Sequence, residues 1–485
     1  MSDSLKTIII GAGPAGLAAA MELSRAGRSF SIFEKSDRVG GLAKTYSFAE
    51  PDGLTFRTDN GPHRFFSKNP YLYTFIEGLI KENWIEVKRQ TRQYIAGKFY
   101  DYPINPAQAL ANIGPKKATR MIMDYTAAQI RYGLLKKPIR HFEDHVVAHF
   151  GRTLAEFNMI NYTEKIWGVK ANTIHTDWAT QRIKGLSVGF LIKAAADRTI
   201  GSLRTKPLRT LVDSFYYPEY GTGLIYETIA AQLANTGSPV SCGSYPVRIR
   251  HHNRWITGIT LSINGTERNI TPHEIIESIP PKEFLALLDP APPAEVMMAA
   301  EKMRYRDQVY LFITLDKDRV THDQWIYFPE THIPFGRISE MKNFSAKMSP
   351  AGKTSLFIEF FCFEGDTIWN ATKEDLLELT MKHLEPLGFC KRSDVRHSYL
   401  MRAKKVYPIY DTGYEKYVTA VKQYLDCFEN LYYIGRPGRF RYNNQDHSLE
   451  MGIMAARSVI TGVRQDIDAV GGENEYFEKG NHGTA

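Results

Sequence analysis

Residues 6–35 read KTIIIGAGPAGLAAAMELSRAGRSFSIFEK, and this stretch decides the fold. The pattern predicts a strand, a tight turn, an apolar-periodic helix and a second strand. Gly11, Gly13 and Gly16 have the G-x-G-x-x-G spacing, which provides the turn, lets the backbone approach a pyrophosphate and allows the helix to pack closely on the sheet. The start of such a helix also offers free N–H groups to phosphates. We therefore expect a dinucleotide-binding βαβ unit.

Glu34 strengthens this prediction. It ends the second strand, 18 residues after Gly16, where a carboxylate can accept both hydroxyls of an adenosine ribose. A glycine-rich turn in an ordinary βαβ unit is the alternative, and it leaves Glu34 without a role.

The next glycines favour FAD over NAD as the dinucleotide. Arg38-Val39-Gly40-Gly41-Leu42 places a glycine pair close behind Glu34, where an NAD domain would normally continue into a helix. This pair resembles the second half of the FAD fingerprint in glutathione-reductase-like and amine-oxidase-like flavoproteins. Around this turn we expect Lys35, Gly41 and Leu42 to contact the cofactor.

Length and composition set the class of protein. The 485 residues allow two or three domains, and 43% hydrophobic with 24% charged residues is typical of a soluble globular chain. No run of eighteen apolar residues and no charged-then-apolar leader occurs, so we expect no transmembrane segment and a cytoplasmic location. The net charge of +8 favours anionic ligands or membrane surfaces, but no nucleic-acid motif or basic stripe is evident. The four cysteines lack metal-ligand spacing, so we expect no metal site and interpret them as buried small hydrophobes.

The order of patterns along the chain predicts an α/β fold with three parts. The first is a Rossmann-type, glutathione-reductase-like FAD-binding domain assembled from residues 1–100, 210–290 and 415–468. The second is a basic helical insertion over 101–209, and the third a β-sheet substrate domain over 291–414. The remaining residues, 469–485, are polar and glycine-rich and are predicted to be disordered.

Three local patterns add detail. Residues 69–84 predict an amphipathic helix, and residues 89–105 a β-hairpin whose aromatic side chains either fill a sheet face or form a stacking surface. Residues 449–465 predict a long helix, capped by Asp446 or Ser448, with its N-terminal dipole directed at the cofactor.

Several longer motifs resemble those of the UDP-galactopyranose mutases and their bacterial relatives, within the wider FAD-dependent amine-oxidase and protoporphyrinogen-oxidase-like group. The resemblance runs nearly end to end. The motifs that carry it are GPHRFF (61–66), GKFYDYPIN (97–105), YTEKIWG (162–168), DWATQRI (177–183), WIYFPE (325–330), PFGRIS (334–339) and NNQDHS (443–448).

The resemblance implies roles for individual residues. His63 would lie beside the flavin, with a structural hydrogen bond to its turn as the alternative, and Arg182 with Arg337 would grip a nucleotide diphosphate. Either arginine alone is more often a surface or salt-bridged residue. Further cofactor contacts would be Val247, Gly435, Arg436, Asn444, Gln445 and Ser448. The sugar pocket would be lined by Tyr102, Thr163, Trp167, Tyr327, Tyr407, Tyr410 and Tyr442, with Tyr407 and Tyr410 open between pocket wall and core. Thr163 stands where the eukaryotic mutases carry an asparagine, and residues 438–444 form a shorter segment than theirs.

The resemblance also implies an activity. A mutase of this kind interconverts the pyranose and furanose forms of a nucleotide sugar, and its flavin works in the reduced state, FADH2 or FADH−, which needs an external reductant such as NAD(P)H or a reductase. Planar guanidinium forks suit the diphosphate, whose charge grows as it leaves the sugar. The alternative is an FAD-dependent oxidase or desaturase. Two pocket arginines disfavour an amine or an apolar polyene, although the carboxylates of a porphyrin fit them. A flavin-binding structural protein would leave these motifs unexplained.

Overall fold

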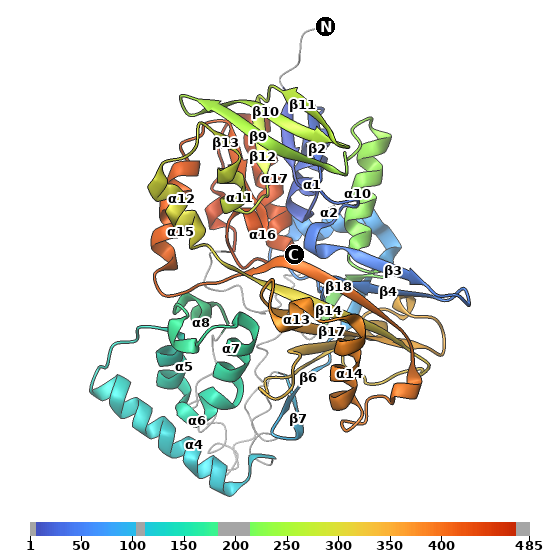
Figure 1. Cartoon of the computed structure of the whole chain (residues 1–485), viewed down its shortest axis with the longest axis vertical. Helices are drawn as coiled ribbons and strands as arrows, with labels where there is room; N and C mark the ends of the chain where they lie inside the picture. The colour runs from blue at the N-terminus through green and yellow to red at the C-terminus, as the bar shows by residue number, and fades with distance from the viewer. Residues whose placement is uncertain (1–5, 103–111, 183–213, 472–485) are drawn as a thin grey trace.

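The computed structural model describes residues 6–102, 112–182 and 214–471. The βαβ unit lies in the upper part of Figure 1, a large mixed sheet lies at the lower right, and a group of helices lies at the lower left. The predicted α/β fold with a Rossmann-type domain is confirmed.

A four-stranded parallel sheet forms the centre of the upper part. Its order is β19 (Leu431–Tyr433), β12 (Glu274–Glu277), β1 (Thr7–Ile10) and β2 (Phe30–Phe33). All four residues of β1 are buried, as expected for a parallel strand covered on both faces. Because Ile9 pairs with both Ile276 and Ile32, the sheet joins stretches of chain that are far apart in the sequence.

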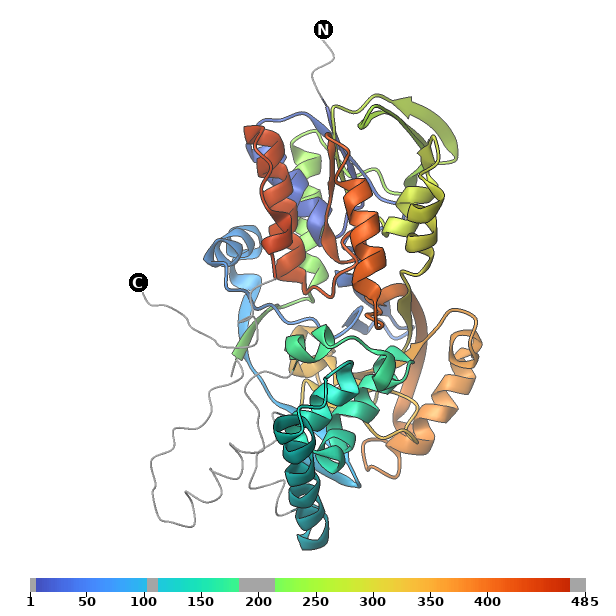
Figure 2. The same ribbon diagram turned by 90° about the vertical axis from the view of Figure 1, so that its left-hand side faces the viewer.

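Helices cover one face of this sheet. α1 (Pro14–Arg25) lies between α17 (Gln445–Thr461) and α10 (Gly223–Asn235), and α2 (Pro70–Ile80) packs beyond α10 (Figure 2). The helix expected over 69–84 is therefore present, although it ends at Ile80. These helices bury one apolar core against β1 and β12.

The opposite face is covered by a small sheet and three helices. The sheet order is β11 (Thr266–Ile270), β10 (Trp255–Ile263), β9 (Ser244–His252) and β13 (Leu288–Asp289). Asn264 and Gly265 both have positive φ in the β10–β11 turn, as a tight hairpin requires. The helices are α11 (Pro281–Ala286), α12 (Ala294–Glu301) and α15 (Tyr414–Leu425).

The large sheet has seven strands and carries the second core. Its order is β18 (Val395–Pro408), β14 (Tyr305–Leu315), β17 (Thr354–Cys362), β16 (Arg337–Glu340), β15 (Trp325–Tyr327), β6 (Thr91–Ile95) and β7 (Lys98–Asp101). The predicted hairpin is β6–β7, and β6 pairs in parallel with β15. The hairpin thus belongs to this sheet, whereas most of it was expected in the dinucleotide-binding domain.

Two helices pack on the large sheet, and two short ribbons connect the parts of the molecule. The helices are α13 (Thr367–Asn370) and α14 (Lys373–Leu384). One ribbon pairs β3 (Thr45–Ala49) with β4 (Thr55–Asp59), and the other pairs β5 (Trp84–Lys88) with β8 (Ser214–Pro218).

The helical group forms a separate small core around Trp167 and Trp178. Part of the helical insertion and most of the tail predicted to be disordered lie outside the described residues. The helices are α4 (Pro115–Ala128), α5 (Phe142–Phe150), α6 (Arg152–Leu154), α7 (Asn161–Trp167) and α8 (Asp177–Arg182).

Two local predictions are wrong. α17 begins at Gln445, and its N-cap is Asn444, whose backbone N–H donates to His447 Nδ1 at 3.1 Å, so neither Asp446 nor Ser448 caps it. Cys427 is exposed and Cys242 only partly buried, because each lies at the edge of an element, whereas Cys362 and Cys390 are buried as expected. No helix in the described part of the chain is both long and apolar enough to cross a membrane.

Candidate functional site

The two glycine motifs meet at the end of β1. Gly40 N donates to Ala12 O at 2.8 Å, and a Cβ on Gly41 would lie 3.1 Å from Gly13 Cα. A Cβ on Gly16 would lie 1.9 Å from Gly11 O, so this glycine is required for packing of α1 on the turn. A Cβ on Gly13 would meet only Gly41 Cα, at 3.8 Å. The turn therefore leaves open space at Gly13, where a pyrophosphate can approach.

Glu34 lies directly after β2, against the same turn. Its carboxylate accepts hydrogen bonds from Ala12 N and Ser36 N, both at 2.8 Å, and its backbone oxygen accepts Ser244 N at 2.8 Å. The start of β9, which contains Val247, is thereby held beside Glu34. Lys35 is exposed, with its ammonium 5.6 Å from the centroid of the Tyr245 ring.

The start of α17 approaches this region from the other end of the chain. Gly435 is the first residue of α16 (Gly435–Gly438) and lies against the βαβ unit, because a Cβ there would lie 3.2 Å from Ala15 Cβ. Gln445 uses its side chain for structure: Oε1 accepts Thr222 Oγ1 at 3.0 Å and Tyr226 Oη at 2.8 Å. Ser448 Oγ donates to Asn444 O at 3.3 Å within the helix.

His63 is tied to the second glycine motif. Its Nε2 lies 2.9 Å from Leu42 O, and the ring is only partly exposed. Burial, opposed by the hydrogen bond to the Leu42 carbonyl and assisted by the positive charges of Arg436 and Arg337, lowers the pKa of His63 to about 4. The ring is therefore neutral at pH 7 and donates to Leu42. This contact is a structural hydrogen bond, but to the glycine turn at Leu42 and not to the turn that contains His63, and the ring lies within the electrostatic influence of the two arginines.

Arg337 is held by a buried carboxylate. Its Nη2 donates to Glu359 Oε1 at 2.7 Å and its Nε donates to Oε2, in the bidentate arrangement that arginine and carboxylate favour. Register explains the pairing, because Arg337 on β16 lies directly opposite Glu359 on β17. The Glu359 charge raises the pKa of Arg337 well above its usual value. The fork is thus charged and fixed.

Arg436 is held by rings instead of by an acid. Its guanidinium carbon lies 4.6 Å from the Tyr407 centroid and 4.7 Å from that of Tyr442, and the two rings stack at 5.6 Å. Nη1 donates to Asn443 O at 3.3 Å, but the buried Nε and Nη2 have no hydrogen-bond partner among the described residues. Unsatisfied buried donors are rare because each costs about 1–3 kcal/mol. They point to a ligand.

Aromatic side chains surround these arginines on two sides. On one side, Trp167 contacts the Tyr407 ring at 6.0 Å, and its buried Nε1 has no partner in the described structure. On the other, Tyr327 contacts Tyr102 at 5.2 Å and lies 5.9 Å from the Arg337 guanidinium carbon.

Not every predicted pocket residue lines this space. Tyr410 is in the core: its hydroxyl accepts Tyr442 N at 2.6 Å, and burial raises its pKa to about 12. Tyr100 is also fully buried, which favours the sheet-face interpretation for that part of the hairpin. Thr163 is buried on α7. The backbone of Arg182 ends α8, and its side chain lies outside the described residues.

Two residues of the site, Glu359 and Tyr162, were not predicted from the sequence. Glu359 stands inside the apolar stretch LFIEFF (356–361) of β17, and a lone carboxylate in a buried strand signals a paired cation. Tyr162 contacts the Tyr327 ring at 5.4 Å, and its place at the start of the motif YTEKIWG (162–168), which supplied Thr163 and Trp167, was the signal that could have found it.

Parts of the chain are similar to known proteins. The NAD(P)-binding Rossmann-like domain family matches residues 9–79. The small chain of glutamate synthase [NADPH] from Mycobacterium tuberculosis is 56% identical over 36 residues, 7% of each chain. L-amino-acid oxidase from Bungarus fasciatus is 30% identical over 128 residues, 22% of this chain and 23% of the oxidase. The chain therefore matches these relatives over less than a quarter of their length.

The solved structures extend the likeness to the whole fold. The chain shares its fold with cyclohexylamine oxidase from Brevibacterium oxydans, which matches with a TM-score of 0.64 at 12% identity, over 95% of this chain and 100% of the oxidase. The crystal structure of reduced UDP-galactopyranose mutase also matches, with a TM-score of 0.81 at 24% identity, over 95% of each chain. The resemblance expected from the motifs is thus confirmed for the fold.

Proposed function

We propose that the chain binds FAD between the glycine turns, Glu34 and the start of α17. The open space at Gly13 supports a pyrophosphate there, and the Gly40–Gly41 turn lies within contact of it. Gly11, Gly16, Lys35, Val247, Gly435, Asn444 and Ser448 remain proposed contacts. Gln445 would contribute through its backbone, because its side chain is already bonded. We also propose the expected division into FAD-binding, helical and substrate domains, with the β6–β7 hairpin moved to the substrate domain.

We propose further that the protein is a flavin-dependent sugar-nucleotide mutase. The observation that carries this proposal is the pair of buried donors on Arg436, beside the fixed fork of Arg337 and between aromatic walls. When bound and reduced, the flavin would supply the nucleophile that displaces the nucleoside diphosphate from the sugar.

The chain's own residues would bind and orient the diphosphate. We reassign Arg436, expected to contact the cofactor, to the substrate diphosphate. It can donate Nε and Nη2 to phosphate oxygens, which would satisfy both orphaned groups, and its stacking on Tyr407 and Tyr442 fixes the plane of the fork. Arg337 itself stays charged, but the adjacent Glu359 carboxylate offsets part of that charge. The pair would therefore present a positioned dipole to the diphosphate rather than a full positive charge. Neutral His63 adds no charge to the site at pH 7. Arg182, on the helical side, remains a proposed second grip.

The experiment that tests this proposal separates isomerisation from oxidation. Dithionite-reduced protein is incubated without oxygen with a panel of nucleotide sugars, and the products are resolved by chromatography. We expect pyranose and furanose forms to interconvert without net consumption of reductant. In a parallel aerobic assay with the oxidised protein, hydrogen peroxide formed in proportion to turnover with an amino acid or porphyrinogen would instead indicate the oxidase chemistry, which the similarity to L-amino-acid oxidase favours.

A further inference from the structure

The outward face of α4 and of the π-helical turn after it, Gln129–Leu134, is strongly apolar. Ten large hydrophobic side chains are exposed in the described structure, and six of them lie within residues 122–139. Such clustering marks an interaction surface, whereas single exposed hydrophobics need no explanation. The six are Ile122 (52% exposed), Met123 (66%), Ile130 (49%), Leu134 (76%), Leu135 (71%) and Ile139 (42%).

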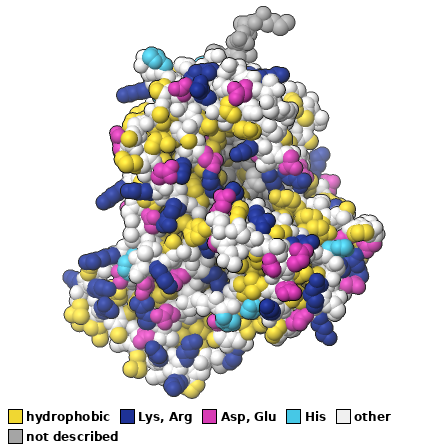
Figure 3. Space-filling view, viewed as in Figure 1, with side chains coloured by type: hydrophobic (Ala, Val, Ile, Leu, Met, Phe, Trp, Pro, Cys, Tyr) yellow, Lys and Arg dark blue, Asp and Glu magenta, His cyan; other side chains and the backbone are white. Residues whose placement is uncertain are grey.

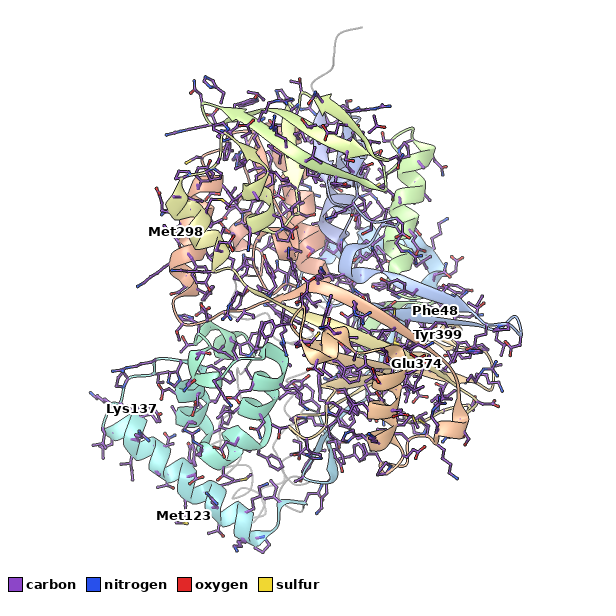
Figure 4. All side chains as sticks on the ribbon, viewed as in Figure 1. Phe48, Met123, Lys137, Met298, Glu374 and Tyr399 are labelled. Carbon is purple, nitrogen blue, oxygen red and sulfur yellow. The ribbon has the colours of Figure 1, made fainter. Side chains whose placement is uncertain are left out.

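The same face is basic. Asp124 is the only acidic residue in the segment 115–140, and its carboxylate accepts Thr153 N at 3.0 Å. Figure 3 shows hydrophobic and basic side chains together at the lower left, where Figure 1 places α4, and Figure 4 labels Met123 and Lys137 toward the two ends of the segment. The exposed cations are Lys116, Arg120, Arg131, Lys136 and Arg140.

The inner face of α4 fixes the helix to the body. The Lys117 ammonium lies 4.3 Å from the centroid of the Phe157 ring, and a Cβ on Gly151 would lie 2.6 Å from Tyr125 N, so the helices touch backbone to backbone. Tyr132 Oη donates to Asp144 Oδ1 at 2.7 Å. The outer side chains are therefore presented by a rigid support and are not needed to hold α4 in place.

We propose that this face, defined by the six apolar and five basic residues above, binds the surface of an anionic lipid bilayer. A helix with an apolar side flanked by lysines and arginines lies in the interface, with the apolar groups among the acyl chains and the cations at the head groups. Charge decides against a second copy of the chain as the occupant. A two-fold interface brings a face against itself, which would oppose five cations to five cations with no free acid between them.

Vesicle sedimentation tests the proposal with the full chain. We expect the protein to bind vesicles containing about 30 mol% phosphatidylserine in phosphatidylcholine, to bind pure phosphatidylcholine weakly, and to be released by about 0.5 M NaCl. The double variant Arg131→Gln/Lys136→Gln should bind anionic vesicles about 30-fold more weakly, and Leu134→Ser/Leu135→Ser about 100-fold more weakly. Circular dichroism and thermal unfolding of each variant verify that the fold is kept.

Matched controls lie on other surfaces. Lys302→Gln/Lys382→Gln removes the same charge, and Met298→Ser removes an exposed apolar side chain (62% exposed), so both should bind vesicles like the unaltered protein. Equal binding by the control and test variants would overturn the proposal. So would a dimer, seen by sedimentation velocity, that Leu134→Ser/Leu135→Ser dissociates while vesicles stay unbound, because the occupant would then be a second copy. Neither result bears on the sugar-nucleotide activity.

Discussion

At the scale of single residues, the two described arginines of the site hold their charge differently. Arg337 is paired with a buried acid on the neighbouring strand, whereas Arg436 is enclosed by two tyrosine rings and keeps two donors without partners. A fork without a competing acid is free to receive an anion, so Arg436 is the stronger ligand of the two for a phosphate group.

Replacement of Arg436 should weaken nucleotide binding directly. A hydrogen bond to a charged group contributes about 1.5–3 kcal/mol, so Arg436→Ala should raise the Kd of a nucleoside diphosphate roughly ten- to a hundredfold. Arg436→Lys should retain only part of the affinity for the nucleoside diphosphate, because an ammonium group cannot form the bidentate fork. Calorimetric titration measures the change, with the surface variant Arg304→Ala as the control. Unchanged affinity in Arg436→Ala would remove the main support for a nucleotide-sugar substrate.

His63 should make stability depend on pH in one direction. Its folded pKa, about 4, lies below the ordinary value of 6.5, so the unfolded chain takes up a proton first as pH falls. Stability should therefore be lost between about pH 6.5 and 4. His63→Gln removes this contribution, and the fall in the free energy of unfolding over that range should be shallower by up to about 3 kcal/mol. Chemical denaturation of both FAD-free proteins at several pH values tests this prediction. The same dependence of the free energy of unfolding on pH in His63→Gln and in the unaltered protein would refute it.

At the scale of elements, close contacts between backbones set the positions of the site's helices and strands. A Cβ on Gly452 of α17 would lie 2.0 Å from Ala15 O of α1, so these two helices touch where no side chain fits. At the other end of the site, Lys165 of α7 binds the chain between β15 and β16: its Nζ donates to the backbone oxygens of Phe328 (2.6 Å), Ile333 (2.9 Å), Phe335 (3.3 Å) and Glu330.

The contact between α1 and α17 predicts an asymmetry between two glycines. Gly452→Ala should destabilise the fold by about 1–3 kcal/mol, because the added methyl group forces the helices apart. Gly78→Ala, in α2, meets nothing within 4 Å and should stabilise by about 0.5–1 kcal/mol through helix propensity. Thermal unfolding of both variants measures whether each substitution lowers or raises the stability of the fold. A stable Gly452→Ala would mean that α1 and α17 are further apart than described.

The Lys165 contact predicts a link between α7 and the strands of the site. Lys165→Met leaves four carbonyl groups without their shared donor, so we expect a loss of about 3 kcal/mol in stability and weaker binding of nucleoside diphosphate. Lys170→Met is the matched control, because that lysine is 78% exposed and, among the residues that the structure describes, forms an ion pair with Glu164 alone. If both variants behave alike, Lys165 does not position β15 and β16.

At the scale of the whole molecule, the parts that could be predicted were those encoded locally. The strand, glycine turn, helix and second strand of residues 6–35 follow from short patterns with fixed periods, and the structure contains these elements in the expected order. The pairing of Arg337 with Glu359 and the enclosure of Arg436 depend on register between strands and on segments that meet only after folding. The lone Glu359 in an apolar strand signals that a cation is paired with it, but spacing along the chain does not identify that cation as Arg337. The cap of α17 was misplaced because several polar residues in a row can each serve as an N-cap.

FAD should stabilise the protein as a whole, since the proposed site joins stretches from both ends of the chain. At a free FAD concentration a hundredfold above Kd, the gain is about 2.7 kcal/mol, seen as a higher Tm. Gly13→Val should remove this gain without unfolding the chain, because its side chain would enter open space at an ordinary backbone conformation. Gly16→Val should unfold the turn itself, since its Cβ would overlap Gly11 O. A Gly13→Val protein that still gains Tm with FAD would contradict the proposed cradle.

The strand order β19-β12-β1-β2 also has a consequence for biosynthesis. β1 leaves the ribosome long before its neighbour β12, and β12 long before β19. At 5–20 residues per second, the interval between β1 and β19 is roughly 20 to 80 s. During that time an apolar strand stands with one edge unpaired, which favours aggregation. The nascent chain is therefore exposed to aggregation until β19 (Leu431–Tyr433) has been made, and a premature stop codon before Leu431 leaves the sheet incomplete.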